Sequence, residues 1–403
     1  LQVRLMEERT RRPIGDAQIH ITYEGEPDGE ERDAVTDESG MTEMITLPAP
    51  NREYSTSISE QQPYAEYTIR ANADGYEPTE VAGTEILPDE TAIQEILMKR
   101  SVQTGEFDRI VIGPHTLFGN YPPKIAESEI KPMTESGEIV LSRVVIPEYV
   151  IVHDGAPSDS SARNYWVRYR DYIKNVASSE IYATWTDAAI RANVLAIMSF
   201  VLNRVYTEWY RNRGYDFTIT SSTAFDQKWI YGRNIYQNIS NIVDEVFGNY
   251  LSRPNVKQPI LTQYCDGRQV SCPGWMTQWG SQSLGEQGYS TIEILRYYYG
   301  ESIYINTAVE ISGVPSSWPG YTLEQGSQGP KVRQIQEELN VIAGAYPEIP
   351  KLTEDGIYGP ETEAAVRKFQ SIFGLPVTGE IDYKTWYKIS EIYVGVSRIA
   401  ELS

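Results

Sequence analysis

The stretch that ends at Glu180 has the apolar spacing of an amphipathic helix. Ile173, Val176, Ala177 and Glu180 are spaced i, i+3, i+4 and i+7, which places them on one helical face. Three of the four are apolar, so this face is expected to pack inward. Burial of the fourth would raise its pKa and suit it to general acid and base chemistry. Periodicity alone favours a structural glutamate that caps a backbone group or pairs with an arginine.

The segment that follows is apolar nearly all round its helical projection. This pattern over residues 188–209 predicts a helix that forms the buried axis of a domain, with capping residues at Trp185–Asp187. A β-like run is expected at 215–223 and another helix at 235–250. Ser290 and Glu293 form a capping-box pattern, which predicts a helix that continues to Tyr299.

The first hundred residues alternate with the period of strands. Strands are predicted at Gln2–Leu5, Gln18–Ile21, Tyr67–Ala71 and Ile93–Met98, separated by Asp-Gly and Ser-Gly turn signals. Their order, and the Tyr67–Tyr76 pattern above all, resembles the carboxypeptidase-regulatory-like or prealbumin-like β-sandwich. Modules of this kind are mostly scaffolds, and this one shows no catalytic constellation.

The fold class predicted from these patterns is a multidomain α+β protein. Residues 1–100 form the β module. Residues 101–150 contain five prolines and are interpreted as a connector with an activation cleavage region and one strand at Ile139–Ile146. Residues 151–321 form a mainly helical α+β central domain. Residues 322–403 show three helical segments, which indicates a three-helix module.

Charge is distributed unevenly along the 403 residues, whose formal net charge is −21. The first hundred residues hold 22 acidic and 9 basic side chains, whereas the central domain has a net charge of only −1. The sequence therefore offers no basic track for nucleic acid or for an anionic membrane surface. No apolar run reaches the roughly 18 residues of a membrane span. We expect neither nucleic acid nor membrane as a partner.

Cys265 and Cys272 are the only cysteines. They are read as a disulfide, with free buried thiols as an alternative and metal binding as the weakest option. The three histidines are His20, His115 and His153, so a zinc site has little sequence support. No metal and no cofactor are expected.

The last eighty residues resemble the peptidoglycan-binding domain found at the ends of cell-wall hydrolases. Five ordered pieces carry the resemblance: Gly326–Val332, Asp355–Thr362, Ala365–Gln370, Gly374–Gly379 and Thr385–Trp386. It implies a helical module that anchors an enzyme on the wall, with Asp355, Tyr358, Phe369 and Trp386 as its motif residues. The alternative is a bundle that kept the fold and lost the ligand.

The central domain resembles the SpoIID family of peptidoglycan lytic transglycosylases. The pieces that carry this are Tyr172–Glu180, Thr220–Gln227 with Tyr231–Gly232, Gly274–Gly280, Glu286–Ser290 and Glu293–Tyr299. The resemblance implies that Glu180 is the catalytic acid and base and that Asp226 helps to position the substrate. Further candidates for substrate binding are Gln227, Tyr231, Trp275, Gln278 and Trp279, although core packing explains the two tryptophans equally well.

The order of these parts resembles the clostridial spore-cortex-lytic enzymes over roughly residues 100–403. This implies cleavage of cortex peptidoglycan during germination, in the spore cortex or coat layer or elsewhere in the extracytoplasmic wall. It also implies a proenzyme activated near residues 140–150 by a subtilisin-like protease, which would remove the acidic N-terminal part. The alternatives are a muramoyl-alanine amidase, a hydrolytic muramidase and a non-catalytic wall-binding protein.

Overall fold

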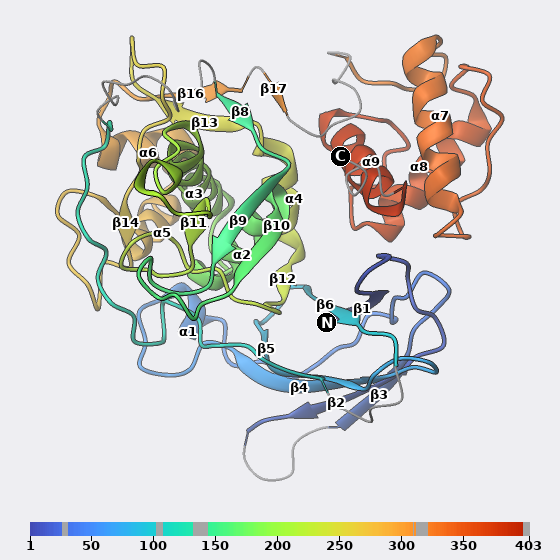
Figure 1. Cartoon of the computed structure of the whole chain (residues 1–403), viewed down its shortest axis with the longest axis horizontal. Coiled ribbons are helices and arrows are strands. Elements are labelled where there is room, and N and C mark those ends of the chain that lie inside the picture. The colour runs from blue at the N-terminus through green and yellow to red at the C-terminus, as the bar shows by residue number, and fades with distance from the viewer. Residues whose placement is uncertain (26–30, 102–107, 132–143, 309, 312–320, 398–403) are drawn as a thin grey trace.

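Strands dominate the N-terminal third of the chain and helices dominate the rest. The computed structural model describes residues 1–25, 31–101, 108–131, 144–308, 310–311 and 321–397. Figure 1 shows the N-terminal sheets below the central helices, with the C-terminal helices beside them. The mixed α+β, multidomain organisation predicted from the pattern is confirmed.

The N-terminal module consists of two sheets. The larger has the strand order β3-β2-β4-β5-β7 and the smaller has the order β1-β6-β12. All eight residues of β5 are buried, as expected for a strand that is covered on both faces. The strands are β1 (Gln2–Glu7), β2 (Gln18–Tyr23), β3 (Glu31–Val35), β4 (Ala65–Asn72), β5 (Thr79–Ile86), β6 (Ala92–Met98) and β7 (Asp108–Val111), and the short helix α1 covers Glu53–Thr56.

The smaller N-terminal sheet is completed by a strand from the central domain. β12 (Ile235–Tyr236) runs antiparallel to β6 and pairs Ile235 with Ile93. Beside this junction Arg233 forms a 2.6 Å ion pair with Glu85, and both side chains are almost fully buried. β7 lies beyond the predicted boundary at residue 100, because it joins the larger sheet parallel to β5. The first two parts of the chain therefore share sheets with their neighbours.

The central part is built round helix α3 (Asp187–Tyr206), the predicted buried axis. Thr186 caps it, because its side chain accepts a hydrogen bond from the Ala189 N–H. Among the described residues α3 is the one helix long and apolar enough to span a membrane, but 83% of its apolar window is buried inside the protein. A helix buried in this way is the core of a domain.

The other central elements lie round this axis. Helices are α2 (Tyr169–Glu180), α4 (Gln237–Val246), α5 (Gln278–Glu286), α6 (Thr291–Tyr299) and the 3₁₀ turn Arg211–Arg213; strands are β8 (Val145–Ile146), β9 (Tyr149–His153), β10 (Asn164–Arg168), β11 (Ile219–Thr220), β13 (Asn249–Ser252), β14 (Tyr264–Cys265), β15 (Met276–Thr277), β16 (Tyr304–Thr307) and β17 (Glu310–Ile311). The capping box at Ser290 is present.

Three sequence predictions differ from the structure at element boundaries. The helix expected at 235–250 is shorter, because residues 235–236 pair as β12 and the helix covers only Gln237–Val246. The run at 215–223 forms a strand only at Ile219–Thr220. Of the strand expected at Ile139–Ile146, Val145–Ile146 pairs with β17, and residues 139–143 lie outside the described residues.

The C-terminal module contains the three predicted helices: α7 (Pro330–Ala343), α8 (Pro360–Ile372) and α9 (Tyr383–Ser397). Tyr358, Phe369 and Trp386 are at most 1% exposed, and Asp355 accepts hydrogen bonds from Gln336 and from the Ile357 N–H. These four motif residues therefore build the module from inside and at a turn. Tyr358, Phe369 and Trp386 are buried in the module and Asp355 is exposed at the turn, so contact of these residues with peptidoglycan stays a prediction.

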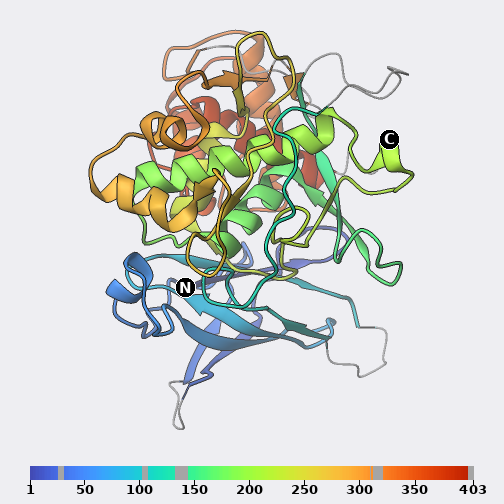
Figure 2. The same cartoon turned by 90° about the vertical axis from the view of Figure 1, so that its left-hand side faces the viewer.

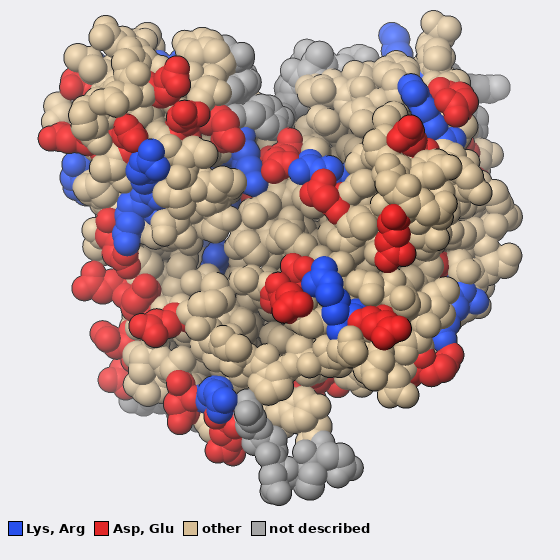
Figure 3. All heavy atoms as spheres, turned by 180° about the vertical axis from the view of Figure 1, so that it is seen from behind, with Lys and Arg blue, Asp and Glu red and all other residues tan. Residues whose placement is uncertain are grey.

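The segment 112–131, which follows β7, forms no helix or strand. Figure 2 shows it as the teal coil that rises from the N-terminal sheets along the central helices. On the face seen in Figure 3, Lys and Arg side chains lie scattered among Asp and Glu, without a continuous track of either charge. That face matches the absence of a basic stripe in the sequence.

We predict that the Glu85–Arg233 pair holds the N-terminal module on the central domain. Arg233→Met would leave the Glu85 carboxyl buried without its cation and lower the free energy of unfolding by about 3–5 kcal/mol, measured by thermal and denaturant unfolding. The double variant Glu85→Leu/Arg233→Met should recover most of this loss. Arg333→Ala, which removes an exposed ion pair with Glu337, should cost under about 0.5 kcal/mol. Equal losses of unfolding free energy in Arg233→Met and Arg333→Ala would contradict the prediction.

Candidate active site

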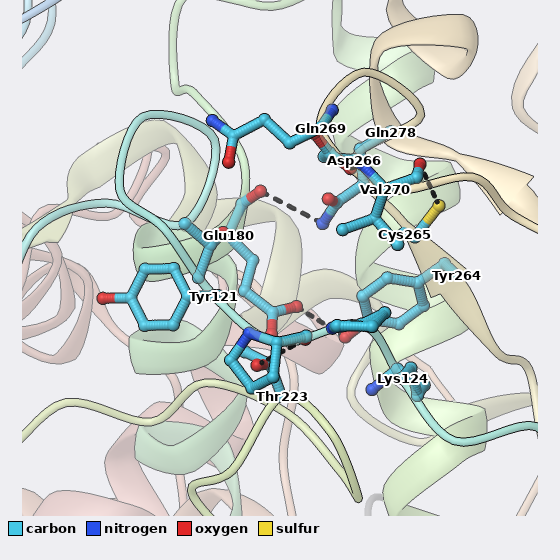
Figure 4. A pocket seen from close by; sticks show the side chains of 13 residues that line it. Tyr121, Lys124, Glu180, Thr223, Tyr264, Cys265, Asp266, Gln269, Val270 and Gln278 are labelled. Carbon is cyan, nitrogen blue, oxygen red and sulfur yellow. Dashed lines mark hydrogen bonds between the residues drawn. The ribbon is translucent and has the colours of Figure 1, made fainter.

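Glu180 is the last residue of α2, and its side chain is buried against two other segments. One carboxylate oxygen, Oε1, accepts a 2.6 Å hydrogen bond from the Lys228 N–H. The other, Oε2, accepts a 2.6 Å hydrogen bond from the Tyr264 hydroxyl. Glu180 is only 4% exposed, yet each oxygen keeps a further lone pair. Figure 4 shows its carboxylate pointing toward Tyr264.

The helix end that carries Glu180 is capped from two sides. The final carbonyls of a helix lack partners within the helix. The Gln278 side chain donates to the Glu180 carbonyl, and the Thr116 N–H donates to the Ser179 carbonyl. Segments far apart in the sequence thus fix the position of the candidate acid.

A chain of buried side chains orients Tyr264. Its hydroxyl accepts a 3.1 Å hydrogen bond from Gln227 Nε2 while it donates to Glu180. Gln227 Oε1 accepts a 3.1 Å hydrogen bond from the Tyr172 hydroxyl. A network in which every member is satisfied is rigid. Gln227 therefore acts behind the site by orienting Tyr264, although the sequence resemblance suggested that it binds substrate.

A cavity of about 60 Å³ opens beside Glu180. Its walls come from the residues after β7, from the end of α2, from the loop before α4 and from the loop after β14; they are Thr116, Tyr121, Pro122, Pro123, Lys124, Glu180, Thr223, Tyr264, Cys265, Asp266, Gln269, Val270 and Gln278. Small-molecule sites usually measure about 300–1,000 Å³. The cavity has room for only a few water molecules and is too small for a sugar.

Two features shape the cavity wall opposite Tyr121. Cys265 and Cys272 are joined by a disulfide, with 5.8 Å between their Cα atoms, and the loop that it closes contributes three of the lining residues. Asp266 in that loop accepts hydrogen bonds from the Gln269 and Val270 N–H groups. It is the second carboxylate of the cavity.

Burial raises the pKa of Glu180 above its ordinary value of 4.5. Its position at the C-terminal end of a helix acts in the same direction, because the macrodipole is negative there. The Lys124 amine, the Lys228 N–H and the Tyr264 hydroxyl oppose the rise. Lys124 itself has its pKa lowered to about 8 by burial. The protonated form of Glu180 is therefore favoured more than in water, and Lys124 limits the effect.

Asp226 lies beneath the cavity wall and does not line it. Its side chain is fully buried, and it accepts hydrogen bonds from Arg204, Tyr210 and both the N–H and the hydroxyl of Thr220. These donors fix the Asp226 carboxylate in place, and it is absent from the lining of the cavity. The structure thus gives Asp226 a supporting position, whereas the sequence suggested substrate positioning.

Of the four remaining sequence candidates, one lines the cavity and three lie outside its lining. Gln278 lines the cavity. Trp279 is buried against Trp185 and Tyr182, which is core packing. Trp275 is half-buried and outside the cavity lining. Tyr231 packs on Tyr165 and Trp229, also outside that lining.

Sequence reasoning missed several residues at the cavity, chiefly Tyr264, Lys124 and Tyr121. Tyr264 stands next to Cys265, but nothing in the sequence connected it to Glu180. Lys124 follows two prolines in a segment without periodicity. Among the described residues no group of three His, Cys, Asp or Glu side chains could hold a metal ion.

Comparison with known proteins connects the C-terminal module to the cell wall. Residues 328–389 match the family described as "Putative peptidoglycan binding domain". The zinc D-Ala-D-Ala carboxypeptidase of Streptomyces albus G is 40% identical over 77 residues, which are 19% of this chain and 28% of that protein. The autolytic lysozyme of Clostridium acetobutylicum is 28% identical over 175 residues, 43% of this chain and 42% of that protein.

The chain thus covers less than half the length of either of these relatives. Among solved structures, the N-terminal domain of SleB is 28% identical, with 19% of this chain and 99% of that chain covered. The TM-score of that comparison is 0.17, so it carries no argument about the fold.

We predict that the Glu180 carboxyl makes stability depend on pH. Its pKa is raised in the folded protein, so its stabilising contribution is greatest below about 4.5 and is lost as pH rises toward the folded pKa. Glu180→Gln should therefore gain stability relative to the wild type as pH increases, measured as the difference in unfolding midpoint across pH 4–8. Glu293→Gln should show the opposite trend, because hydrogen bonds with Ser290 lower the pKa of Glu293. A pH-independent difference for Glu180→Gln would refute the prediction.

Proposed function

We propose that this protein is a peptidoglycan lytic transglycosylase with Glu180 as its single acid and base. The observation that carries the proposal is the setting of Glu180: a buried carboxyl with a raised pKa, held at both oxygens, at the wall of a cavity. General acids that work near neutral pH need this environment.

In the proposed reaction Glu180 donates its proton to the glycosidic oxygen between N-acetylmuramic acid and N-acetylglucosamine. The C1–O bond breaks and N-acetylglucosamine leaves as an alcohol. The 6-hydroxyl of the muramoyl residue then attacks its own C1, and the Glu180 carboxylate accepts the proton of that hydroxyl. The product is a 1,6-anhydro end, and no water is consumed. The Lys228 N–H and the Tyr264 hydroxyl stabilise the carboxylate between the two proton transfers.

The substrate and the location are inferred from the C-terminal module and the relatives. The module matches the putative peptidoglycan-binding domain over residues 328–389, and one relative carries the name autolytic lysozyme. Both support a cell-wall degrading enzyme that acts on peptidoglycan outside the cytoplasm. The finer proposal is an enzyme of the SleC type with a SpoIID-like catalytic domain, which degrades spore cortex during germination.

Storage as a proenzyme fits the arrangement of the connector. Tyr121, Pro122, Pro123 and Lys124 cover one side of the cavity, so the described form leaves no space for a sugar beside Glu180. Cleavage between residue 131 and β9 would break the covalent link between these residues and the central domain, so that they could leave the cavity. Val144, Ile146 and Val150 are at most 5% exposed, which supports a cut before residue 144 rather than after it. A subtilisin-like protease is the proposed activator.

Hydrolytic cleavage by a muramidase is the second candidate, because Asp266 lines the same cavity as Glu180. A pair of carboxylates is the usual equipment of glycoside hydrolases. The two N–H groups that bind the Asp266 carboxylate favour a structural role in its loop. An amidase would need a zinc site, for which the described residues offer no ligand group. A non-catalytic wall-binding protein would bind peptidoglycan and release nothing.

We predict that Glu180→Gln abolishes cleavage but not wall binding. With protein cut by subtilisin and with the uncut chain in parallel, the release of anhydro-muropeptides from purified spore cortex should fall at least ~100-fold, as expected for loss of a general acid. Mass spectrometry identifies the products. The variant should still sediment with insoluble peptidoglycan, because the C-terminal module is unchanged.

The matched control is Glu301→Gln, an exposed glutamate, which should keep full activity. Asp266→Asn distinguishes the two mechanisms: a transglycosylase keeps its anhydro products in this variant, and a muramidase loses its reducing-end products. Near-wild-type activity of Glu180→Gln would disprove the assignment, and free stem peptides would identify an amidase.

A further inference from the structure

Residues 121–131, here called the strap, lie against the central domain with inverted polarity. They form no helix or strand. The two isoleucines, Ile125 and Ile130, are 51% and 41% exposed, while Lys131 is only 4% exposed. A segment that serves only to hold the fold together would bury its apolar side chains. The strap directs its charged groups inward, so the surface beneath it must be hydrophilic.

Two arginines of that surface bind the carboxylates of the strap through paired hydrogen bonds. Arg204 donates to both oxygens of Glu127 at 3.0 and 2.6 Å. Arg253 donates to both oxygens of Glu129 at 2.7 and 2.8 Å. Bidentate pairs of this kind are the preferred geometry for recognition of a carboxylate.

Two glutamines of the same surface form hydrogen bonds with the peptide backbone of the strap. Gln263 accepts from the Glu127 N–H and donates to the Ile125 carbonyl. Gln258 likewise accepts from the Lys131 N–H and donates to its carbonyl. The Leu261 N–H and the Ala224 carbonyl add further backbone hydrogen bonds with the strap. The surface thus presents partners for amides and, at two positions, for carboxylates.

We propose that this surface is a peptide subsite of the active site, which receives an acidic stem peptide of peptidoglycan once the strap has left. A stem peptide attached to a muramoyl residue carries amides and free carboxylates, the two groups that the surface binds in the strap. Arg204 and Arg253 are the carboxylate receptors, and Gln258 and Gln263 bind the amides. The inference rests on the proposed function and names the part of its substrate that the cavity at Glu180 does not reach.

The direction of the strap supports this assignment. Lys124 lines the cavity beside Glu180, its amine lies 5.4 Å from the centre of the Tyr264 ring, and Glu127 and Glu129 follow along the chain. A sugar at Glu180 and its peptide along the path of residues 125–131 would occupy the same space as the strap. The strap therefore competes with the substrate at both positions. Its departure also removes a cation that keeps the pKa of Glu180 down.

The test measures binding to the full chain in the Glu180→Gln background, so that no turnover occurs. The probes are a disaccharide-tetrapeptide muropeptide and the same disaccharide without peptide, titrated by calorimetry. Glu127→Gln/Glu129→Gln weakens the strap and should increase affinity for the muropeptide at least ~10-fold, with a smaller gain for the peptide-free disaccharide. When Arg253→Gln is added to the Glu127→Gln/Glu129→Gln variant, the affinity for the muropeptide should fall about 10-fold, or about 1.4 kcal/mol, relative to that variant. It should leave the peptide-free disaccharide unchanged.

Lys257→Gln is the matched control, because it removes an exposed cation close in sequence to Arg253, and it should change neither affinity. If the double strap variant does not fold, Glu129→Gln alone serves, since the Glu129 side chain is 35% exposed. Equal affinities for the two probes, or no effect of Arg253→Gln, would overturn the subsite while leaving the transglycosylase proposal intact. Peptide-selective binding together with hydrolytic products would support the subsite and overturn the transglycosylase.

Discussion

A buried guanidinium organises the candidate site. The Arg204 side chain is fully buried on α3, the most apolar helix of the protein, and an unpaired charge there would cost several kcal/mol. Its two carboxylate partners come from different segments: Asp226 from the loop before α4 and Glu127 from the strap. With Lys131 bound to Glu127, the cluster contains two cations and two anions. Neutralising Arg204 therefore fixes the loop that supplies the Lys228 N–H to Glu180, and it holds the strap over the cavity.

The need to pair the buried Arg204 with carboxylates from distant segments separates the parts of the site that the sequence predicts from those that it does not. Glu180, the helix before it and the axial helix α3 follow from local periodicity, and the structure contains both helices close to the predicted bounds. An apolar face does not single out Glu180, because all residues of α2 except Asp171 are buried. Asp226 was recognised as an important carboxylate, but only tertiary structure shows that it pairs with Arg204.

What the sequence could not show depends on pairing between distant segments. The addition of β12 to the N-terminal sheet joins residue 235 to residue 93, and a two-residue strand has no detectable alternation. The strap reads as a featureless, proline-containing connector because its charged residues face inward, opposite to the rule on which pattern reading depends. Tyr358, Phe369 and Trp386 were recognised as motif residues, yet sequence could not tell a residue that builds a module from one that binds a ligand.

Helix α2 also connects the candidate acid to the C-terminal module. Near its start Arg170 donates to the Tyr387 carbonyl of α9 and pairs with Glu391, and Lys174 pairs with Asp244. Nearby cations hold the pKa values of Glu391 and Asp244 below their ordinary range, so these ion pairs persist at neutral and mildly acidic pH. Glu180 lies about 15 Å along the same helix from Arg170 at 1.5 Å per residue. A module docked in this way is not free to turn on a linker. In the proposed function, wall binding by the C-terminal helices would therefore set the direction in which a glycan chain of peptidoglycan approaches Glu180. The strap lies on the surface that this glycan chain and its peptide would occupy.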